Sequence, residues 1–195
     1  MKLRGLYAVT PEGEGIERKV RRALEGGIAL LQYRNKRRDR AQAEAIVHLA
    51  RGFGVPVIIN DDVELALEVG AEGAHLGRDD GELPRARERL AGRILGASCY
   101  NDLARAREAV AAGADYVAFG SVFTSPTKPA AVSAPLALFS EAKALGVPLA
   151  AIGGVTLENA PQLIAAGADL LAVISDLFDA PDIRARARAY GRLFA

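Results

Sequence analysis

Carboxylates gather at two points of the sequence, each directly after a short apolar run. Asp61 and Asp62 follow one run, and Asp79 and Asp80 follow the next. Paired carboxylates suit Mg²⁺, which keeps several waters and completes its shell with phosphate oxygens of a substrate. Each pair also precedes a segment with helical spacing, so that helix N-capping is the alternative role. We expect capping to explain some of these aspartates and metal binding to explain others.

A second group of polar residues suits phosphate. Gln32, Arg34 and Lys36 alternate along the end of the apolar run 29–34. Alternate residues of an extended strand point the same way, which predicts an amide and two cations side by side. The planar fork of arginine and the point charge of lysine both match phosphate oxygens. The alternative is that the basic stretch 36–40 is a solvated loop.

Further anion donors follow the remaining apolar runs. Hydroxyl groups and a lysine occur in the loop 120–129, where two prolines restrict the backbone. Gly153 and Gly154 have no side chains, so their N–H groups could approach a phosphate closely. Ser98 and Ser175 are additional hydroxyl donors. His75 lies within an apolar run and Cys99 has no base beside it, so we interpret both as packing residues.

These residues are positioned by a regular alternation of short apolar runs and longer amphipathic segments. The short runs lack strict polar alternation and are flanked by glycines, which is typical of parallel strands buried on both faces. The predicted strands are 6–9, 29–34, 56–60, 73–76, 94–98, 116–119, 149–152 and 170–174. The predicted helices are 16–25, 40–52, 63–69, 84–90, 103–112, 136–145, 159–166 and 183–193.

Strands alternating with helices imply an α/β fold with a parallel sheet, and closure into a (β/α)₈ barrel (a TIM barrel) leaves no exposed strand edge. The 195 residues predict one such barrel, 1–195, as a single domain. The alternative is a doubly wound open sheet, but its Gly-x-Gly-x-x-Gly signature is missing after the first strand. In a barrel, the carboxyl ends of the strands form the catalytic face, so the polar groups above should converge there.

A repeated helix-to-strand joint supports the barrel. The segment 111–115, Ala-Ala-Gly-Ala-Asp, recurs as 165–169, and each copy places a glycine where a helix ends. Asp115 and Asp169 then lie at the amino ends of strands, on the face associated with stability. We interpret both as structural residues.

Composition narrows the function classes. The chain carries 25 basic and 24 acidic residues, a net charge of +1, which argues against a surface built for nucleic acid or anionic membranes. One cysteine, the lack of a signal-like apolar start and the lack of a run near about 18 apolar residues predict a cytoplasmic protein. A homodimer is a further expectation.

Taken together, the segments resemble the thiamine phosphate synthase family over almost the whole chain. No single motif is specific to this family, but the order of the motifs on successive strand ends is specific to it. The motifs are Gln32-x-Arg34-x-Lys36, Asn60-Asp61-Asp62, His75-Leu76-Gly77-x-x-Asp80, Ser98, Ser125-x-Thr127-Lys128, Ile152-Gly153-Gly154 and Ile174-Ser175.

The resemblance implies that the protein joins hydroxymethylpyrimidine pyrophosphate to thiazole phosphate. It implies pyrimidine contacts for Gln32, Asn60 and Ser98, with Ser98 able to reach the pyrophosphate instead. Arg34, Lys36 and Lys128 would hold the pyrophosphate, and these three with Ser98 form the implied catalytic set. Asp61 and Asp80 would bind Mg²⁺. The implied thiazole phosphate contacts are Ser125, Thr127, Gly154, Ile174 and Ser175.

The sequence departs from the family pattern at three places. Ser125 replaces a usual threonine, Arg78 replaces a common glutamine, and residues 129–140 lack a glycine-leucine turn. Related thiazole tautomerases share the phosphate site but often lose the pyrophosphate and metal motifs, which are intact here. A metal-independent tautomerase is therefore the first alternative, and a non-catalytic binding protein for thiamine phosphates is the second.

Overall fold

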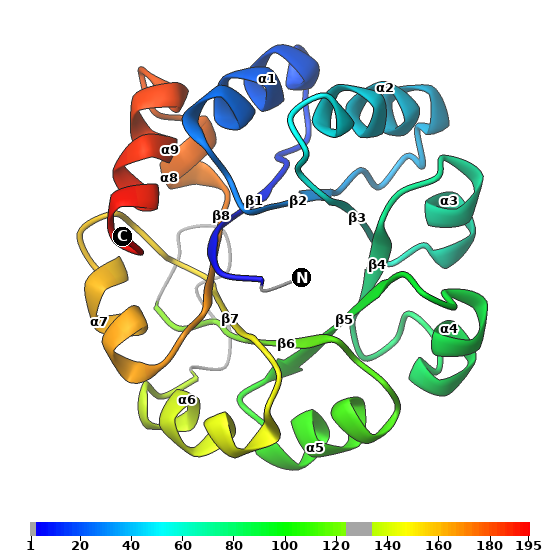
Figure 1. Cartoon of the computed structure of the whole chain (residues 1–195), viewed down its shortest axis with the longest axis vertical. Coiled ribbons are helices and arrows are strands. Elements are labelled where there is room, and N and C mark those ends of the chain that lie inside the picture. The colour runs from blue at the N-terminus through cyan, green and yellow to red at the C-terminus, as the bar shows by residue number, and fades with distance from the viewer. Residues whose placement is uncertain (1–2, 124–133) are drawn as a thin grey trace.

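Short buried apolar runs form eight parallel strands that close into a barrel in sequence order, with β8 returning to pair with β1 (Figure 1). The computed structural model describes residues 3–123 and 134–195. The strands are β1 (Gly5–Val9), β2 (Leu30–Tyr33), β3 (Val57–Asn60), β4 (Gly73–Leu76), β5 (Ile94–Tyr100), β6 (Tyr116–Phe119), β7 (Leu149–Ile152) and β8 (Leu170–Val173). The predicted (β/α)₈ barrel is confirmed, and the open-sheet alternative is wrong.

Helices form a ring around this barrel, as Figure 1 shows. They are α1 (Ile16–Gly26), α2 (Arg40–Arg51), α3 (Val63–Glu68), α4 (Leu83–Arg89), α5 (Leu103–Ala111), α6 (Ala137–Ala142), α7 (Ala160–Ala166), α8 (Ser175–Phe178) and α9 (Ile183–Arg192). A 3₁₀ turn, Lys143–Leu145, continues α6. Within the described ranges, no helix combines the length and apolar character needed to cross a bilayer.

Aspartates define the starts of several helices. Asp39, Asp62, Asp102 and Asp182 each accept a hydrogen bond from the backbone N–H three residues further on, at the first turn of α2, α3, α5 and α9. Such N-caps satisfy a donor that the helix itself leaves without a partner. The capping role considered for the 61–62 pair therefore belongs to Asp62.

The apolar residues divide into two cores. Along β1, Leu6 and Ala8 pack outward against the helices, whereas Tyr7 and Val9 belong to the cluster inside the barrel. The inner cluster also contains Tyr116, whose ring lies against Gly96 of β5. A Cβ built on Gly96 would lie 2.2 Å from that ring, so glycine is required for Tyr116 to occupy the interior.

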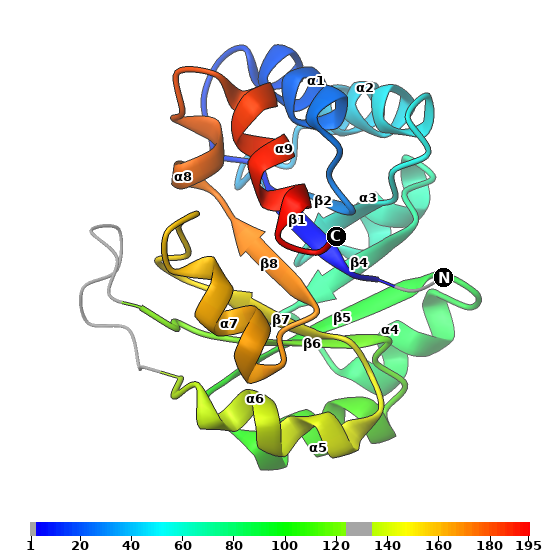
Figure 2. The same ribbon diagram turned by 60° about the vertical axis from the view of Figure 1, so that its left-hand side comes forward.

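The first and last elements of the fold meet along a seam. β1 pairs with β8, and α1 packs against α9, where a Cβ on Gly26 would lie 2.4 Å from the Ala187 Cβ. Figure 2 shows α9 beside α1. The Arg4 guanidinium lies 5.4 Å from the centre of the Phe194 ring and donates to the Phe194 carbonyl at 3.3 Å.

Candidate active site at the carboxyl ends of the strands

Asp61 lies directly after β3, at the rim formed by the carboxyl ends of the strands. Its backbone is in the left-handed region (φ 60°), a conformation that aspartate tolerates better than most residues. The Asp61 N–H donates to the His75 carbonyl of β4 at 2.8 Å, and the Asp61 carboxylate accepts from the Asn60 amide at 2.5 Å. The residue is thus fixed at both its backbone and its side chain.

Asp80 reaches the same place from the loop after β4. Its carboxylate accepts from the Gly77 N–H at 2.8 Å, and a Cβ on Gly77 would lie only 2.6 Å from that oxygen. Glycine at position 77 therefore permits the close approach. The capping alternative for Asp79 or Asp80 is wrong, because α4 begins at Leu83 with Glu82 at its N-cap.

The two carboxylates interact. Partial removal from water, together with the neighbouring Asp80, raises the pKa of Asp61 to about 6, while Asn60 and Arg34 oppose the shift. Two crowded carboxylates beside an amide form an oxygen-rich donor set whose mutual repulsion a divalent cation would relieve. The set therefore fits Mg²⁺, although the described residues include no group of three or more His, Cys, Asp or Glu residues able to hold a metal.

Arg34 stands on the same rim. The buried Thr10 hydroxyl accepts from the Arg34 N–H at 2.9 Å, which fixes the backbone just beyond β2. The Arg34 guanidinium pairs with Glu12 at 3.2 Å and acts on Asp61 through its charge. The expected convergence of three side chains by strand alternation needs correction, because β2 ends at Tyr33 and Lys36 lies in the following turn with its side chain exposed.

The basic stretch 36–40 serves partly as structure. Arg38 pairs with Asp62 at 2.6 Å and with Glu68 at 3.2 Å, so it ties this loop to α3. Asp39 is the N-cap of α2. These contacts give Arg38 a structural role, and within this stretch we consider Lys36 for phosphate binding, together with the preceding Arg34.

Gln32 and Ser98 face the barrel interior rather than the outer rim. A chain of hydrogen bonds connects them through Tyr7, Tyr116 and His75. His75 is buried in the core, as expected, and this burial lowers its pKa to about 4, so the imidazole is neutral. Cys99 is also buried, in agreement with a packing role.

The opposite side of the rim carries the predicted thiazole phosphate residues. The Gly154 carbonyl accepts from the Asn159 amide at 2.9 Å, and Ser175 is the exposed first residue of α8. Asp176 joins the two segments, because its carboxylate accepts from the Leu157 N–H at 3.3 Å. Half-buried Ile174 lies between β8 and α8. The predicted residues Ser125, Thr127 and Lys128 lie outside the described residues.

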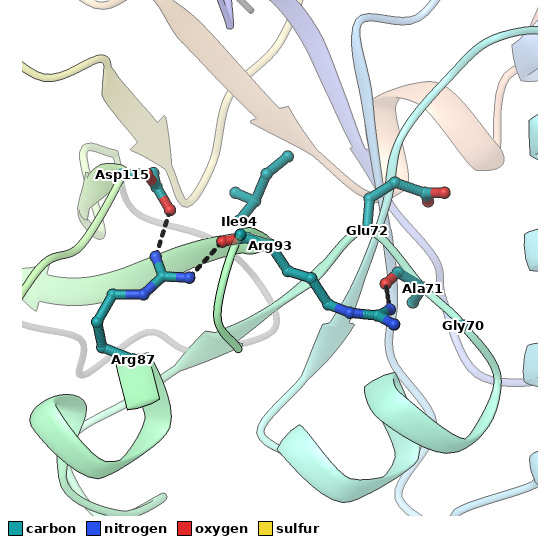
Figure 3. A pocket seen from close by; sticks show the side chains of 8 residues that line it. Gly70, Ala71, Glu72, Arg87, Arg93, Ile94 and Asp115 are labelled. Carbon is teal, nitrogen blue, oxygen red and sulfur yellow. Dashed lines mark hydrogen bonds and ion pairs between the residues drawn. The ribbon is translucent and has the colours of Figure 1, made fainter. Parts of the chain in front are cut away.

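A polar hollow of about 670 Å³ lies at the other end of the barrel, where β4, β5 and β6 begin (Figure 3). Arg87 pairs there with Asp115 at 2.9 Å, and Arg93 donates to the Ala71 carbonyl. Asp115 also accepts from the Leu95 N–H at 2.8 Å. These groups bind one another, so the contacts in this hollow hold neighbouring loops together. Asp115 therefore has the structural role expected for it.

Sequence reasoning missed several residues that position this site. Thr10, Gly77 and Asp176 hold Arg34, Asp80 and α8 in place, as described above. Gly77 belongs to the motif at residues 75–80, so its position offered a signal. Thr10 and Asp176 did not, since their roles depend on neighbours that are distant in sequence.

Comparison with known proteins agrees with this geometry. Residues 6–177 match the family described as "Thiamine monophosphate synthase". The thiamine-phosphate synthase of Aromatoleum aromaticum is 59% identical over 99% of this chain and 97% of its own length. That of an Azoarcus species is 55% identical over 100% and 98%. A thiamine phosphate pyrophosphorylase structure from Pyrococcus furiosus superposes with a TM-score of 0.88 and 32% identity, covering 99% of this chain and 96% of that one.

Proposed function

Because this chain belongs to the thiamine monophosphate synthase family, we propose that it joins hydroxymethylpyrimidine pyrophosphate to thiazole phosphate, forming thiamine phosphate and releasing pyrophosphate. The observation that carries the proposal is the meeting of Arg34, Asp61 and Asp80 at the carboxyl rim. This combination of a cation and two carboxylates suits a metal-bound pyrophosphate.

The reaction requires little acid–base chemistry from the protein. The bond between the pyrimidine CH₂ carbon and the pyrophosphate oxygen breaks, and its electron pair leaves with pyrophosphate. The thiazole nitrogen then supplies its lone pair to the same carbon, and no proton is removed from the nitrogen. Catalysis therefore depends on stabilising charge at the leaving oxygen and on holding the two reactants in line.

The side chains divide these tasks by position. Gln32, Asn60 and Ser98 would contact the pyrimidine, and Arg34, Lys36 and Lys128 would bind the pyrophosphate. Asp61 and Asp80 would hold Mg²⁺, which supplies Lewis-acid stabilisation of phosphate oxygens. The thiazole phosphate would bind at Gly154, Ile174 and Ser175 with Ser125 and Thr127. We further expect these small phosphorylated substrates, and no nucleic acid or membrane, as partners of a cytoplasmic homodimer.

The experiment that tests this proposal supplies both substrates with Mg²⁺ or with chelator and measures thiamine phosphate. We expect product with Mg²⁺, loss with chelator, and a decrease of about 10- to 100-fold in Asp61→Asn, since a negative charge is removed from the metal site. Asp79→Asn, which changes an exposed neighbour of Asp80, is the matched control and should keep full activity.

Two other outcomes would replace the proposal. Turnover of a thiazole phosphate tautomer in the presence of chelator, with Asp61→Asn fully active, would identify a tautomerase. Calorimetric binding of thiamine phosphate without any turnover would identify a binding protein.

A further inference from the structure

Five polar side chains form a continuous chain of hydrogen bonds across the barrel interior. The Gln32 Nε2 lies 2.5 Å from the Tyr7 hydroxyl, which lies 2.6 Å from the Tyr116 hydroxyl. The Tyr116 hydroxyl is 2.8 Å from His75 Nδ1, and His75 Nε2 is 2.8 Å from Ser98 Oγ. The chain thus begins and ends at residues proposed to touch the pyrimidine.

Four of these five side chains are buried, so the loss of any of their hydrogen bonds would be costly. Tyr7 and Tyr116 are at most 1% exposed, Gln32 is 4% exposed and His75 is 6% exposed. Tyr116 stacks on His75 and meets the edge of Tyr7, with ring centres 5.5 Å and 5.8 Å apart. Buried donors that lose their partners are costly, and the described part of the chain contains no such buried side-chain atom.

This requirement fixes the direction of donation. Gln32 Nε2 can only donate, so the Tyr7 proton must pass on to Tyr116, since it would otherwise have no acceptor. Tyr116 then donates to His75 Nδ1. Because Nδ1 accepts this proton, the N–H of the imidazole lies on Nε2 and points to Ser98.

The two ends of the chain consequently have opposite character. None of the described residues donates to Gln32 Oε1, so this oxygen is left as an acceptor for a ligand. Ser98 Oγ already accepts from His75, so its own proton is available to donate. Reversing one end requires the other four groups to reverse as well, because a partial reversal sets two donors or two acceptors face to face.

We propose that Tyr7, Tyr116 and His75 are positioning residues that hold Gln32 as an acceptor and Ser98 as a donor, and so select a 4-aminopyrimidine over a 4-oxopyrimidine. The identity of the ring rests on the function proposed above. A 4-amino group donates and its adjacent ring nitrogen accepts, so a 4-aminopyrimidine that contacts both ends matches their acceptor and donor character. A 4-oxo ring exchanges the two roles and needs the whole chain reversed.

The decisive experiment compares kcat/KM for the pyrophosphates of the 4-amino and the 4-oxo pyrimidine. In Tyr116→Phe the Tyr7 proton becomes free to donate to Gln32 Oε1, so the amide can turn and either ring is accepted. We expect the amino-to-oxo ratio to fall by about tenfold or more, because hydrogen-bond readout gives large discrimination. A purely structural role would lower both values together and leave the ratio unchanged, which would overturn the proposal.

A second test variant and a control variant complete the experiment. Tyr7→Phe interrupts the chain at another point and should lower the same ratio, which covers poor folding of Tyr116→Phe. Tyr33→Phe also removes a tyrosine hydroxyl, but one that bonds to the Asp39 carbonyl and Gln42 on the outer side of the barrel. Its ratio should equal that of the unaltered protein.

A measurement without substrate separates this inference from the proposed function. The sequence contains two histidines, His48 and His75, so ¹⁵N-histidine labelling gives a simple imidazole spectrum. We expect His75 to be protonated on Nε2 and bare on Nδ1, and an Nδ1–H tautomer would overturn the inference. If the unaltered protein forms no thiamine phosphate, the proposed function is overturned. The tautomer of His75 then still tests the direction of the hydrogen bonds.

Discussion

Asp61 combines a raised pKa with a proposed role as a metal ligand, and the two properties compete. Its pKa is raised to about 6 by partial removal from water and by Asp80. Below that pH a proton must leave before Mg²⁺ binds. We predict that the Mg²⁺ concentration for half-maximal activity is constant above pH 6 and rises about tenfold per pH unit below it.

Steady-state kinetics at several Mg²⁺ concentrations between pH 5 and 8 would measure this dependence. Asp79→Asn should follow the same curve as the unaltered protein. A Mg²⁺ requirement that does not change over that range would contradict the assignment of Asp61. In the absence of metal, the raised pKa of Asp61 also affects stability, because the folded state binds the proton more readily than the unfolded state. This contribution to the free energy of unfolding is lost as the pH rises from about 4 to about 6.

His75 gives a pH dependence of opposite sign. Burial lowers its pKa from 6.5 to about 4, so the unfolded chain binds the proton more readily than the folded one. The stabilisation is complete above pH 6.5 and is lost as the pH falls towards 4, by about 3 kcal/mol in total. Urea unfolding at successive pH values should show this loss in the unaltered protein and in His48→Gln, but not in His75→Gln. Parallel curves for the unaltered protein and His75→Gln would contradict it.

Residue types alone could predict part of this site. Carboxylates after neighbouring strands were enough to expect that the pairs 61–62 and 79–80 meet, because parallel strands end at one rim. The family resemblance, not the residue types, singled out Asp61 and Asp80. The chain from Gln32 to Ser98 could not be predicted, since Tyr7 and Tyr116 lie in apolar runs where a tyrosine is equally consistent with plain packing. Their hydroxyls acquire a role only when strands 109 residues apart face each other across the barrel.

At the scale of elements, α8 is held in place by one carboxylate. Asp176 accepts from Tyr190 at 2.7 Å and pairs with Arg186 at 2.6 Å, both on α9, and also accepts from Leu157. We predict that Asp176→Ala raises the KM for thiazole phosphate about tenfold with a much smaller change in kcat, because loss of these charge-assisted bonds, each contributing about 1.5–3 kcal/mol, displaces Ser175.

Kinetics with the thiazole phosphate as the varied substrate would check this prediction. Asp179→Ala, at the exposed end of α8, is the control and should leave the KM unchanged. An unchanged KM in Asp176→Ala would show that α8 keeps its place without this contact.

Element boundaries followed the sequence wherever the local signal was strong. Buried apolar runs between glycines located all eight strands to within two residues at either end. Two features were missed. α8 has four residues, too few for a helical period, and β5 continues to Tyr100 through an irregularity after Ser98 that depends on pairing with β6.

At the scale of the whole molecule, the two ends of the barrel have different roles. The rim at the carboxyl ends carries Asp61, whereas Asp169 at the amino ends accepts from the Leu149 N–H at 3.1 Å. We predict that Asp169→Ala lowers the free energy of unfolding by about 1–3 kcal/mol while kcat/KM changes less than about twofold. Urea unfolding and the two-substrate assay on the same preparation would test this, and a large loss of kcat/KM would contradict the separation.

The seam between β1 and β8 has a consequence for engineering. Arg4 and Phe194 touch where the ring closes, so we expect that a glycine linker can join the chain on the two sides of this contact. A new opening could then be cut at the exposed Gly146, between the 3₁₀ turn and β7, far from the rim. Such a circular permutant should assemble the same pocket from a different starting strand, since each strand pairs only with its two neighbours around the closed sheet.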